Sequence, residues 1–512
     1  MKEVIIVGSG INGLVAANYL VKHGFNVSVI EKKPTTGGAC VKDSTIIEKK
    51  NIDFAYGATV LGMMPDFIFQ ETGLSDKIEG YYPKTPKLVY FNDEETSTKI
   101  YQDYVKLEKE LYEKWGEKGR VNEFRNDENK VVKFIQKLYR NATSPSVDIA
   151  NDHLGKDLTS LWITGSAKNL LDHYFSSEKT KLYMGMTVIE SGPASIYDPG
   201  TAFTIPLMDS GSIFDGYWGF VKTGIWKITE NLTEINRRLG VKFYLDSEIQ
   251  EVDNKSNSVS FSKINKDYKL NYDHLIFATD PVTPSKLIND FNNNIDLDLI
   301  GTSGKVTAFF KNPVRWKDSN NYSDSFRFIF SVDSLNSFED ASQNALKDLD
   351  NYFPGFIQVY PEGSAQRKMN NKEDFDKLIF FTKNFSYNKE AKNLNDIKEK
   401  IISTVMPHIE NPEDLVYSKF LTPKDLNETF LFPKGNIDHS TLTGDQNYHK
   451  RTFSDNKDNF YSYYDYENIF YCGAGSFPCG SVAGTPGYML SLIHISEPTR
   501  QAEISYAVVC LK

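Results

Sequence analysis

Apolar residues follow two periodicities along this chain, one typical of buried strands and one typical of amphipathic helices. Residues 3–7 form a short β-branched run without polar alternation, the pattern of a strand buried on both faces of a parallel sheet. From Ile11 to His23 apolar positions recur at helical spacing, and a second short apolar run occupies residues 26–30. The pattern therefore predicts a βαβ unit in this part of the chain.

A glycine-rich turn joins the predicted strand to the predicted helix. Its sequence, Gly8-Ser-Gly-Ile-Asn-Gly13, has the pattern G-x-G-x-x-G. The first glycine permits a tight turn, the second lets the backbone approach a pyrophosphate, and the third lets the helix pack close to the strand. The free N–H groups and the dipole of the helix N-terminus favour the phosphate charge. The residues predicted to bind a dinucleotide here are Gly8, Gly10, Ile11, Asn12 and Gly13.

An acidic residue follows the second strand at the interval where a ribose hydroxyl is expected. This residue is Glu31, and its negative charge argues against a 2′-phosphate, so FAD or NAD fits better than NADP. Lys32 comes next, followed by the pair Gly37-Gly38. This pair resembles the one found just after the acidic residue in flavoproteins of the glutathione-reductase-like class, which includes amine oxidases and carotenoid desaturases. We therefore expect FAD, with these four residues at its site.

The central part of the chain predicts helices first and then mixed structure. Between residues 66 and 214 several stretches have apolar residues three and four apart, which indicates amphipathic helices over a core. A helix, two strands at 241–245 and 247–252, and a buried strand at 275–280 follow. Strand-like runs recur at 356–360 and 377–382, without a second glycine fingerprint or cysteine pair. A pyridine-nucleotide disulfide reductase would need both features.

A second glycine-rich segment follows a short apolar run at 469–472. It runs from Gly473 to Gly487 and resembles the C-terminal flavin motif of phytoene-desaturase-like oxidoreductases. The similarity is greatest to the branch that includes the pyridine nucleotide-disulphide oxidoreductase domain-containing protein 2. By this resemblance the flavin is expected to contact Gly473, Ala474, Gly475, Pro486 and Gly487. Cys479 stands where relatives usually carry glycine; it is either an unreactive turn residue or, less favoured, a thioether link to flavin.

The resemblance implies an α/β fold with interleaved domains. We expect a Rossmann-like FAD-binding domain of the glutathione-reductase/amine-oxidase type formed by 1–65, 215–290 and 441–489. An α+β substrate domain would comprise 66–214 and 291–440, and a strand at Ile249 would pass the adenine. Residues 490–512 resemble a translated sequencing adaptor, so we predict a non-native tail and exclude it from fold reasoning.

Composition narrows the classes of protein and of partner that remain possible. Hydrophobic residues make up 40% and charged residues 25%, and the net charge is -10, which indicates a globular protein and argues against nucleic acid as a partner. No export signal or membrane-spanning run is visible, so we expect a cytoplasmic protein, with peripheral membrane contact as an additional expectation. The cysteines have neither redox-dithiol nor metal-ligand spacing, so no metal site is predicted.

These observations predict an FAD-dependent oxidoreductase of the desaturase or dehydrogenase type. It would abstract hydride from a small apolar substrate, isoprenoid or acyl-like, and pass electrons to oxygen or a quinone. No catalytic residue is assigned, because His153 and His173 fit packed or surface positions better than a catalytic one. Two alternatives remain open at this point: a flavin-free prenyl-binding chaperone of the same fold, and an amine oxidase.

Overall fold

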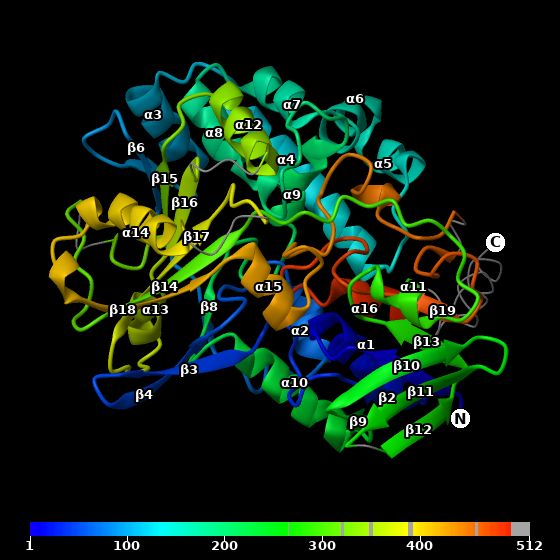
Figure 1. Cartoon of the computed structure of the whole chain (residues 1–512). Helices are drawn as coiled ribbons and strands as arrows, with labels where there is room; N and C mark the ends of the chain where they lie inside the picture. The colour runs from blue at the N-terminus through cyan, green and yellow to red at the C-terminus, as the bar shows by residue number, and fades with distance from the viewer. Residues whose placement is uncertain (265, 319–321, 348–351, 388–392, 456–458, 493–512) are drawn as a thin grey trace.

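The computed structural model describes residues 1–264, 266–318, 322–347, 352–387, 393–455 and 459–492. Of the predicted non-native tail, only residues 490–492 are among them, so the prediction for 493–512 lies outside the described residues. Figure 1 shows a parallel sheet at the lower right, a larger sheet at the left, and a layer of helices across the top.

A five-stranded parallel sheet contains the predicted βαβ unit. Its order is β19 (Ile469–Tyr471), β13 (His274–Phe277), β1 (Glu3–Val7), β2 (Asn26–Ile30) and β9 (Lys242–Tyr244). Alternate residues of β1 are buried on opposite faces, Val4 and Ile6 in one core cluster and Ile5 and Val7 in another. The run of apolar residues without polar alternation therefore reflects burial on both faces, as predicted.

Each face of the parallel sheet has its own cover. One face packs against α1 (Ile11–Lys22), which also contacts α10 (Trp226–Arg238) and α16 (Thr485–Leu490). The other face shares a core cluster with an antiparallel sheet formed by β10 (Ser247–Asp253), β11 (Ser258–Lys263) and β12 (Lys266–Asn271). Residues from three distant parts of the sequence thus meet around α1.

The larger sheet has seven strands, mostly antiparallel. Its order is β18 (Leu415–Leu421), β14 (Gly304–Phe310), β17 (Asp376–Thr382), β16 (Phe356–Tyr360), β15 (Arg327–Phe330), β6 (Lys87–Phe91) and β7 (Thr98–Ile100). One face packs on α14 (Leu394–Val405) through side chains such as Val306 and Phe380. The residues that alternate with these, Lys305 and Phe381 among them, line a cavity described below.

Helices cover the upper side of the molecule (Figure 1). They are α3 (Tyr104–Trp115), α4 (Val121–Arg140), α5 (Val147–Leu154), α6 (Lys156–Leu158), α7 (Ala167–Tyr174), α8 (Glu178–Gly185), α9 (Thr204–Met208) and α12 (Leu335–Asn344). The prediction of amphipathic helices agrees with α3, whose Leu107, Leu111 and Trp115 are buried, whereas Tyr104 at its first turn is exposed. Within the described residues, no helix is both long enough and apolar enough to cross a bilayer.

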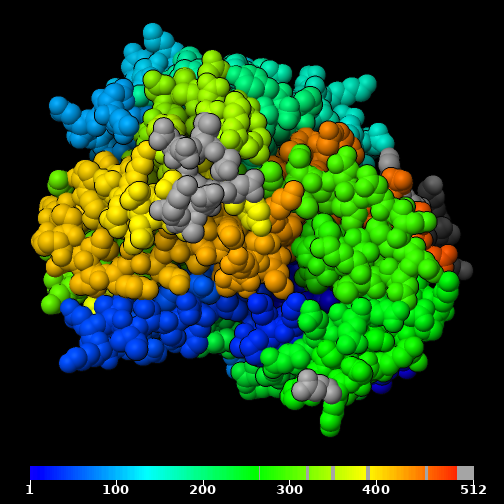
Figure 2. Space-filling view, in the orientation of Figure 1, coloured from blue at the N-terminus to red at the C-terminus, as the bar shows by residue number. Residues whose placement is uncertain are grey.

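The remaining elements are short. They are β3 (Lys42–Ile47), β4 (Lys50–Ala55), α2 (Asp66–Glu71), β5 (Gly80–Tyr81), β8 (Phe220–Val221), α11 (Thr283–Leu287), α13 (Glu362–Lys368) and α15 (Pro423–Phe430). In the space-filling view, the blue N-terminal part, the orange segment that includes α15 and the green part that includes residues 240–290 meet on one face (Figure 2). The same three parts of the chain contribute to the wall of the cavity.

Candidate cofactor site

A cavity of about 1270 Å³ lies between the parallel sheet and the seven-stranded sheet. The predicted site residues that line it are Gly8, Gly10, Ile11, Asn12, Glu31, Lys32, Gly37, Gly38, Ile249 and Ala474. Five further predicted residues do not line it: Gly13, Gly473, Gly475, Pro486 and Gly487. The structure therefore brings both glycine segments to one place, although only part of the second one faces the open space.

The turn before α1 presents bare backbone to this cavity. A Cβ atom added to Gly10 would meet no heavy atom within 4 Å, so the space in front of this residue is open. Gly10 is the N-cap of α1, and the first turn has no side-chain cap and no acidic residue. Helix N-terminal N–H groups without an internal acceptor attract anions. The arrangement fits a diphosphate beside Gly10.

The other glycines of this turn serve close packing. Gly8 has φ +97°, which L side chains rarely adopt, and a Cβ on it would lie 2.9 Å from the carbonyl oxygen of Ala278. A Cβ on Gly13 would lie 2.3 Å from the carbonyl oxygen of Gly8. Gly13 thus lets α1 pack against the turn, as its position in the motif predicts, and does so without facing the cavity.

The carboxylate of Glu31 is held in place by its neighbours. Its Oε2 accepts hydrogen bonds from the backbone N–H of Ser9 at 2.8 Å and from the Ser9 hydroxyl at 2.6 Å. Its Oε1 accepts one from the N–H of Lys33 at 2.9 Å. Sequence reasoning missed Ser9, which stands at the variable position of the motif. These bonds fix the carboxylate at the cavity wall, where a ribose hydroxyl would reach it.

The second glycine pair lies directly against the first turn. The N–H of Gly37 donates to the carbonyl oxygen of Ser9 at 2.9 Å. A Cβ on Gly38 would stand 3.1 Å from the Cα of Gly10. Lys32 pairs with Glu248 at 2.6 Å on the surface, next to Ile249 of β10. The predicted residues near the nucleotide end are therefore close together in space.

The C-terminal glycine segment packs on the protein backbone. A Cβ on Gly473 would lie 2.1 Å from the carbonyl oxygen of Thr279, and one on Gly487 would lie 2.0 Å from the carbonyl oxygen of Asn12. A Cβ on Gly475 would instead lie 2.9 Å from the hydroxyl oxygen of Tyr471, a side-chain atom. The residues of this segment that line the cavity are Ala474, Gly480, Ser481 and Val482. Sequence reasoning did not assign the last three of these to the site.

A buried arginine ties this segment to the preceding one. Arg451 is 2% exposed, and its guanidinium donates to the carbonyl oxygens of Asp438 at 2.8 Å and Ala474 at 2.9 Å. Asp438 in turn accepts the N–H of Gly480 at 2.9 Å through Oδ1. No motif surrounds Arg451 in the sequence, so nothing in the pattern indicated it.

Comparison with known proteins finds similarity in sequence to a Rossmann-like domain and to desaturases. Residues 6–67 match the family model described as an NAD(P)-binding Rossmann-like domain. Over 305 residues the chain is 26% identical to a 4,4′-diapophytoene desaturase (4,4′-diaponeurosporene-forming) of Staphylococcus aureus (strain COL), covering 56% of this chain and 57% of the relative. The protein of the same name from strain Newman is 25% identical over the same shares. Over this shared part the chain is similar in sequence to these diapophytoene desaturases.

The fold is shared with solved amine oxidases. Cyclohexylamine oxidase from Brevibacterium oxydans IH-35A superposes with a TM-score of 0.59 at 14% identity, covering 99% of both chains. Putrescine oxidase bound to putrescine gives a TM-score of 0.58, also at 14% identity and 99% coverage of both. The predicted fold class is thereby confirmed. The chain spans about 57% of the length of the curated relatives that it matches.

Opposite the turn at Gly10, the cavity meets the seven-stranded sheet. Lys305 of β14 lines it and donates through Nζ to the carbonyl oxygens of Ala55 at 2.6 Å, Gly57 at 2.9 Å and Tyr56 at 3.1 Å. Burial lowers the pKa of Lys305 to about 7. The three carbonyl oxygens favour its protonated form, so this amine links the sheet to the segment that follows β4.

The histidines differ in their placement. His439 lines the cavity, and its Nδ1 lies 3.2 Å from the carbonyl oxygen of Thr279. Burial lowers the pKa of His439 to about 4, although the charge of Asp280 opposes the shift. The two histidines considered from sequence, His153 and His173, are exposed and lie outside the cavity wall.

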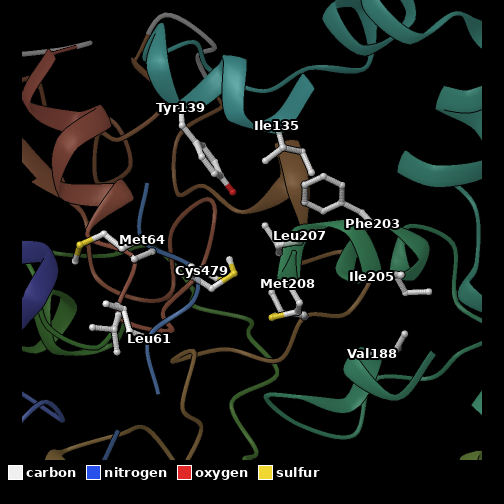
Figure 3. Close-up of a cluster of buried hydrophobic side chains, with 14 of the residues drawn as sticks. Leu61, Met64, Ile135, Tyr139, Val188, Phe203, Ile205, Leu207, Met208 and Cys479 are labelled. Atoms are coloured by element: carbon white, nitrogen blue, oxygen red, sulfur yellow. The ribbon is translucent and has the colours of Figure 1, made fainter. Parts of the chain in front are cut away.

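The cysteines within the described residues are free and buried. Burial raises the pKa of Cys40 to about 12 and raises that of Cys479 well above its usual range. Figure 3 shows Cys479 among apolar side chains that include Met64 and Met208. Within the described part of the chain, no group of three or more His, Cys, Asp or Glu side chains has the arrangement of a metal site.

Proposed function

We propose that this chain is an FAD-dependent oxidoreductase of the desaturase or dehydrogenase type. The observation that carries the proposal is one cavity that joins the bare helix N-terminus at Gly10 to a wall of the seven-stranded sheet. At about 1270 Å³ it exceeds the range of roughly 300–1,000 Å³ usual for one drug-sized ligand. It therefore suits a dinucleotide together with a substrate.

The residues present fit the FAD group. Asn12 is 6% exposed and lines the cavity, and its Oδ1 has no hydrogen-bond partner among the described residues, as expected beside a ligand that supplies one. The N–H groups at the start of α1 would hold the diphosphate, Glu31 would bind ribose, and Ile249 would lie along the adenine. The glycine pair Gly37-Gly38 and the segment from Gly473 to Gly487 would complete the site. Both groups of similar proteins are FAD-dependent flavoproteins.

When bound, FAD would accept a hydride equivalent from a C–H bond of the substrate. The chain's own residues would orient that bond and exclude water. Aromatic and aliphatic side chains on the wall, Phe381, Ile379 and Phe430, favour an apolar substrate of the isoprenoid or acyl class. Oxygen or a quinone would receive the electrons. We further propose that residues 1–65, 215–290 and 441–489 form the FAD-binding domain and that 66–214 and 291–440 form the substrate domain.

The proposal is tested by titrating the full chain with FAD and measuring flavin absorbance and binding heat. Gly10→Glu places a carboxylate in the open space before the helix and should abolish binding, because two negative groups cannot share it. Gln102→Glu adds the same charge at an exposed site outside the cavity and should bind FAD normally. A wild-type chain that stays empty, or a Gly10→Glu variant that binds fully, contradicts the proposal. A flavin-free chain that captures an isoprenoid would instead favour a prenyl-binding chaperone.

A further inference from the structure

A small group of polar side chains lies at the wall of the cavity, where the seven-stranded sheet meets the helical layer. Glu190 and Tyr360 line the cavity. Lys383 Nζ lies 3.2 Å from Oε2 of Glu190, and Gln358 Nε2 donates to the same oxygen at 3.3 Å. The hydroxyl of Tyr360 donates to Oε1 of Gln358. We call Glu190, Lys383, Gln358 and Tyr360 the polar cluster.

Strand register explains how the polar cluster forms. Gln358 of β16 pairs with Phe381 of β17, and Tyr360 pairs with Ile379, so these side chains share one face of the sheet. Lys383 continues the alternation just beyond β17, and its Nζ stands 3.8 Å from the centre of the Phe381 ring. Glu190 follows the short helical turn at Met186–Ile189 and reaches this face from the helical layer. The Lys383 ammonium also donates to the backbone oxygen of Glu190 at 2.7 Å.

Folding stability does not account for this ion pair. The side chain of Lys383 is 0% exposed and that of Glu190 is 14% exposed, so both groups have lost most of their water. Burial lowers the pKa of Lys383 to about 8, while the charge of Glu190 opposes that shift. A buried ion pair is often no more stabilising than apolar residues of similar size. Because the buried ion pair adds little folding stability, we infer that the polar cluster serves binding.

One oxygen of Glu190 remains available. Oε2 accepts from Lys383 and Gln358, whereas Oε1 has no hydrogen-bond partner among the described residues. This Oε1 is not enclosed by protein atoms, so it keeps contact with open space. Because Glu190 lines the cavity, the free oxygen offers a hydrogen-bond acceptor to whatever occupies it.

Residues of the polar cluster and of the C-terminal glycine segment line the same cavity. Burial above all raises the pKa of Cys479 in this segment; the charges of Asp438 and Glu190 add to the shift and that of Arg451 opposes it. Ala474 and Gly480 of the same segment line the cavity. A substrate group held by Glu190 would therefore lie in the cavity that this segment also lines, and the flavin is expected to contact this segment.

We propose that Glu190 contacts the substrate directly and accepts a hydrogen bond from its hydroxyl or amino group, with Lys383 and Gln358 as positioning residues. The substrate is then an amphiphile with an apolar chain and a hydrogen-bond-donating group, in place of a pure hydrocarbon. This inference rests on the proposed function, because it takes the cavity as the substrate site. It narrows the substrate class of that same site.

The test uses four probes with the same chain and different end groups: octylamine, 1-octanol, octanoate and octane. Binding of each to the full chain supplied with FAD is measured by calorimetry, and flavin content is measured separately on the same sample. We expect octylamine and octanol to bind at least about tenfold more tightly than octane and octanoate, since a hydrogen bond to a charged group contributes about 1.5–3 kcal/mol. Octanoate should bind weakly because its charge repels Glu190.

Two variants test whether Glu190 is the residue that contacts the probe. Glu190→Gln keeps the shape and removes the charge, and it should reduce octylamine affinity about tenfold. Glu339→Gln is the matched control, because Glu339 is 8% exposed, accepts the N–H of Ile196 at 3.0 Å and lies outside the cavity wall. The control should bind the probes as the wild type does.

The outcomes separate this inference from the proposed function. Equal affinity for all four probes, tightest binding of octanoate, absence of probe binding, or unchanged octylamine affinity in Glu190→Gln each overturns the role of Glu190. The wild-type probe series needs no variant, so the result stands even if Glu190→Gln fails to fold. Loss of flavin with the amine and alcohol preference intact would contradict the cofactor proposal and leave the role of Glu190 supported.

Discussion

The two glycine segments of this chain use the same residue in opposite ways. At the N-terminal turn, a Cβ on Gly10 would enter open space, with no heavy atom within 4 Å. In the C-terminal segment, a Cβ on Gly473 or Gly487 would collide with backbone oxygen at 2.1 or 2.0 Å. The missing side chain of Gly10 leaves open space for a ligand. The missing side chains of Gly473 and Gly487 let two stretches of backbone pack together. A glycine motif therefore indicates close approach without specifying what approaches.

The largest effect is expected from Gly487→Ala. The added methyl group would meet the carbonyl oxygen of Asn12 in α1, and neither helix backbone can move without disturbing the core around it. Overpacking costs about 1–3 kcal/mol and occasionally more, and a contact this short belongs at the upper end of that range. Urea unfolding should show that loss or a failure to fold. Gly10→Ala, the same substitution into open space, is the matched control, and equal stability of the two variants would contradict the packing role of Gly487.

The second-largest effect is expected from acidification, which should lower the free energy of unfolding through His439. Burial lowers the pKa of His439 to about 4 from an ordinary 6.5, so the folded state takes up a proton less readily than the unfolded state. The stability that depends on neutral His439 is then complete above pH 6.5 and is lost as the pH falls towards 4. We expect a loss of about 2 kcal/mol across this range, allowing for partial exposure of the ring.

Unfolding experiments at several pH values check this expectation. His439→Gln should flatten the acid limb of the stability profile, because a side chain that does not titrate in this range replaces the histidine. His153→Gln, at an exposed site, should leave the profile as in the wild type. An unchanged slope in His439→Gln would show that other groups cause the acid loss.

The Gly10→Ala variant has a second, smaller effect, on the cofactor. Gly10 has φ -65°, which alanine also adopts, so we expect the free energy of unfolding to change by no more than about 0.5 kcal/mol. The methyl group would nevertheless occupy the space proposed for the diphosphate. FAD affinity measured by calorimetry should fall about tenfold, a difference of about 1.4 kcal/mol. Normal FAD binding would place the diphosphate elsewhere.

Sequence alone predicted the strands beside the first glycine turn better than the opposite wall of the cavity. The strands predicted at 3–7 and 26–30 coincide with β1 and β2. A short, unbroken β-branched run is typical of a strand buried on both faces of a parallel sheet. The strand predicted at 275–280 ends earlier, at Phe277. Ala278, Thr279 and Asp280 line the cavity instead, and the Asp280 carboxylate accepts the N–H of Val282 and begins a turn.

Residues of the opposite wall carry no local signature. Glu190, Lys305 and His439 come from three distant segments, and only the fold brings them to the wall of one cavity. Each is a single charged or polar residue in an ordinary stretch of sequence. Periodicity predicts which face of a strand is buried, but it does not show which buried positions line open space.

The smallest effect concerns Cys479, in the C-terminal segment. Covalent attachment of flavin would need an accessible thiolate, whereas Cys479 is 0% exposed and burial raises its pKa well above the usual range. Figure 3 shows its side chain in a buried apolar cluster that also contains Leu61 and Met208. Denaturation of the FAD-loaded chain in acid should therefore release all flavin into the supernatant, in the wild type and in Cys479→Ala alike. Yellow colour that stays with the wild-type pellet and disappears in the variant would show a thioether and make this cysteine part of the site.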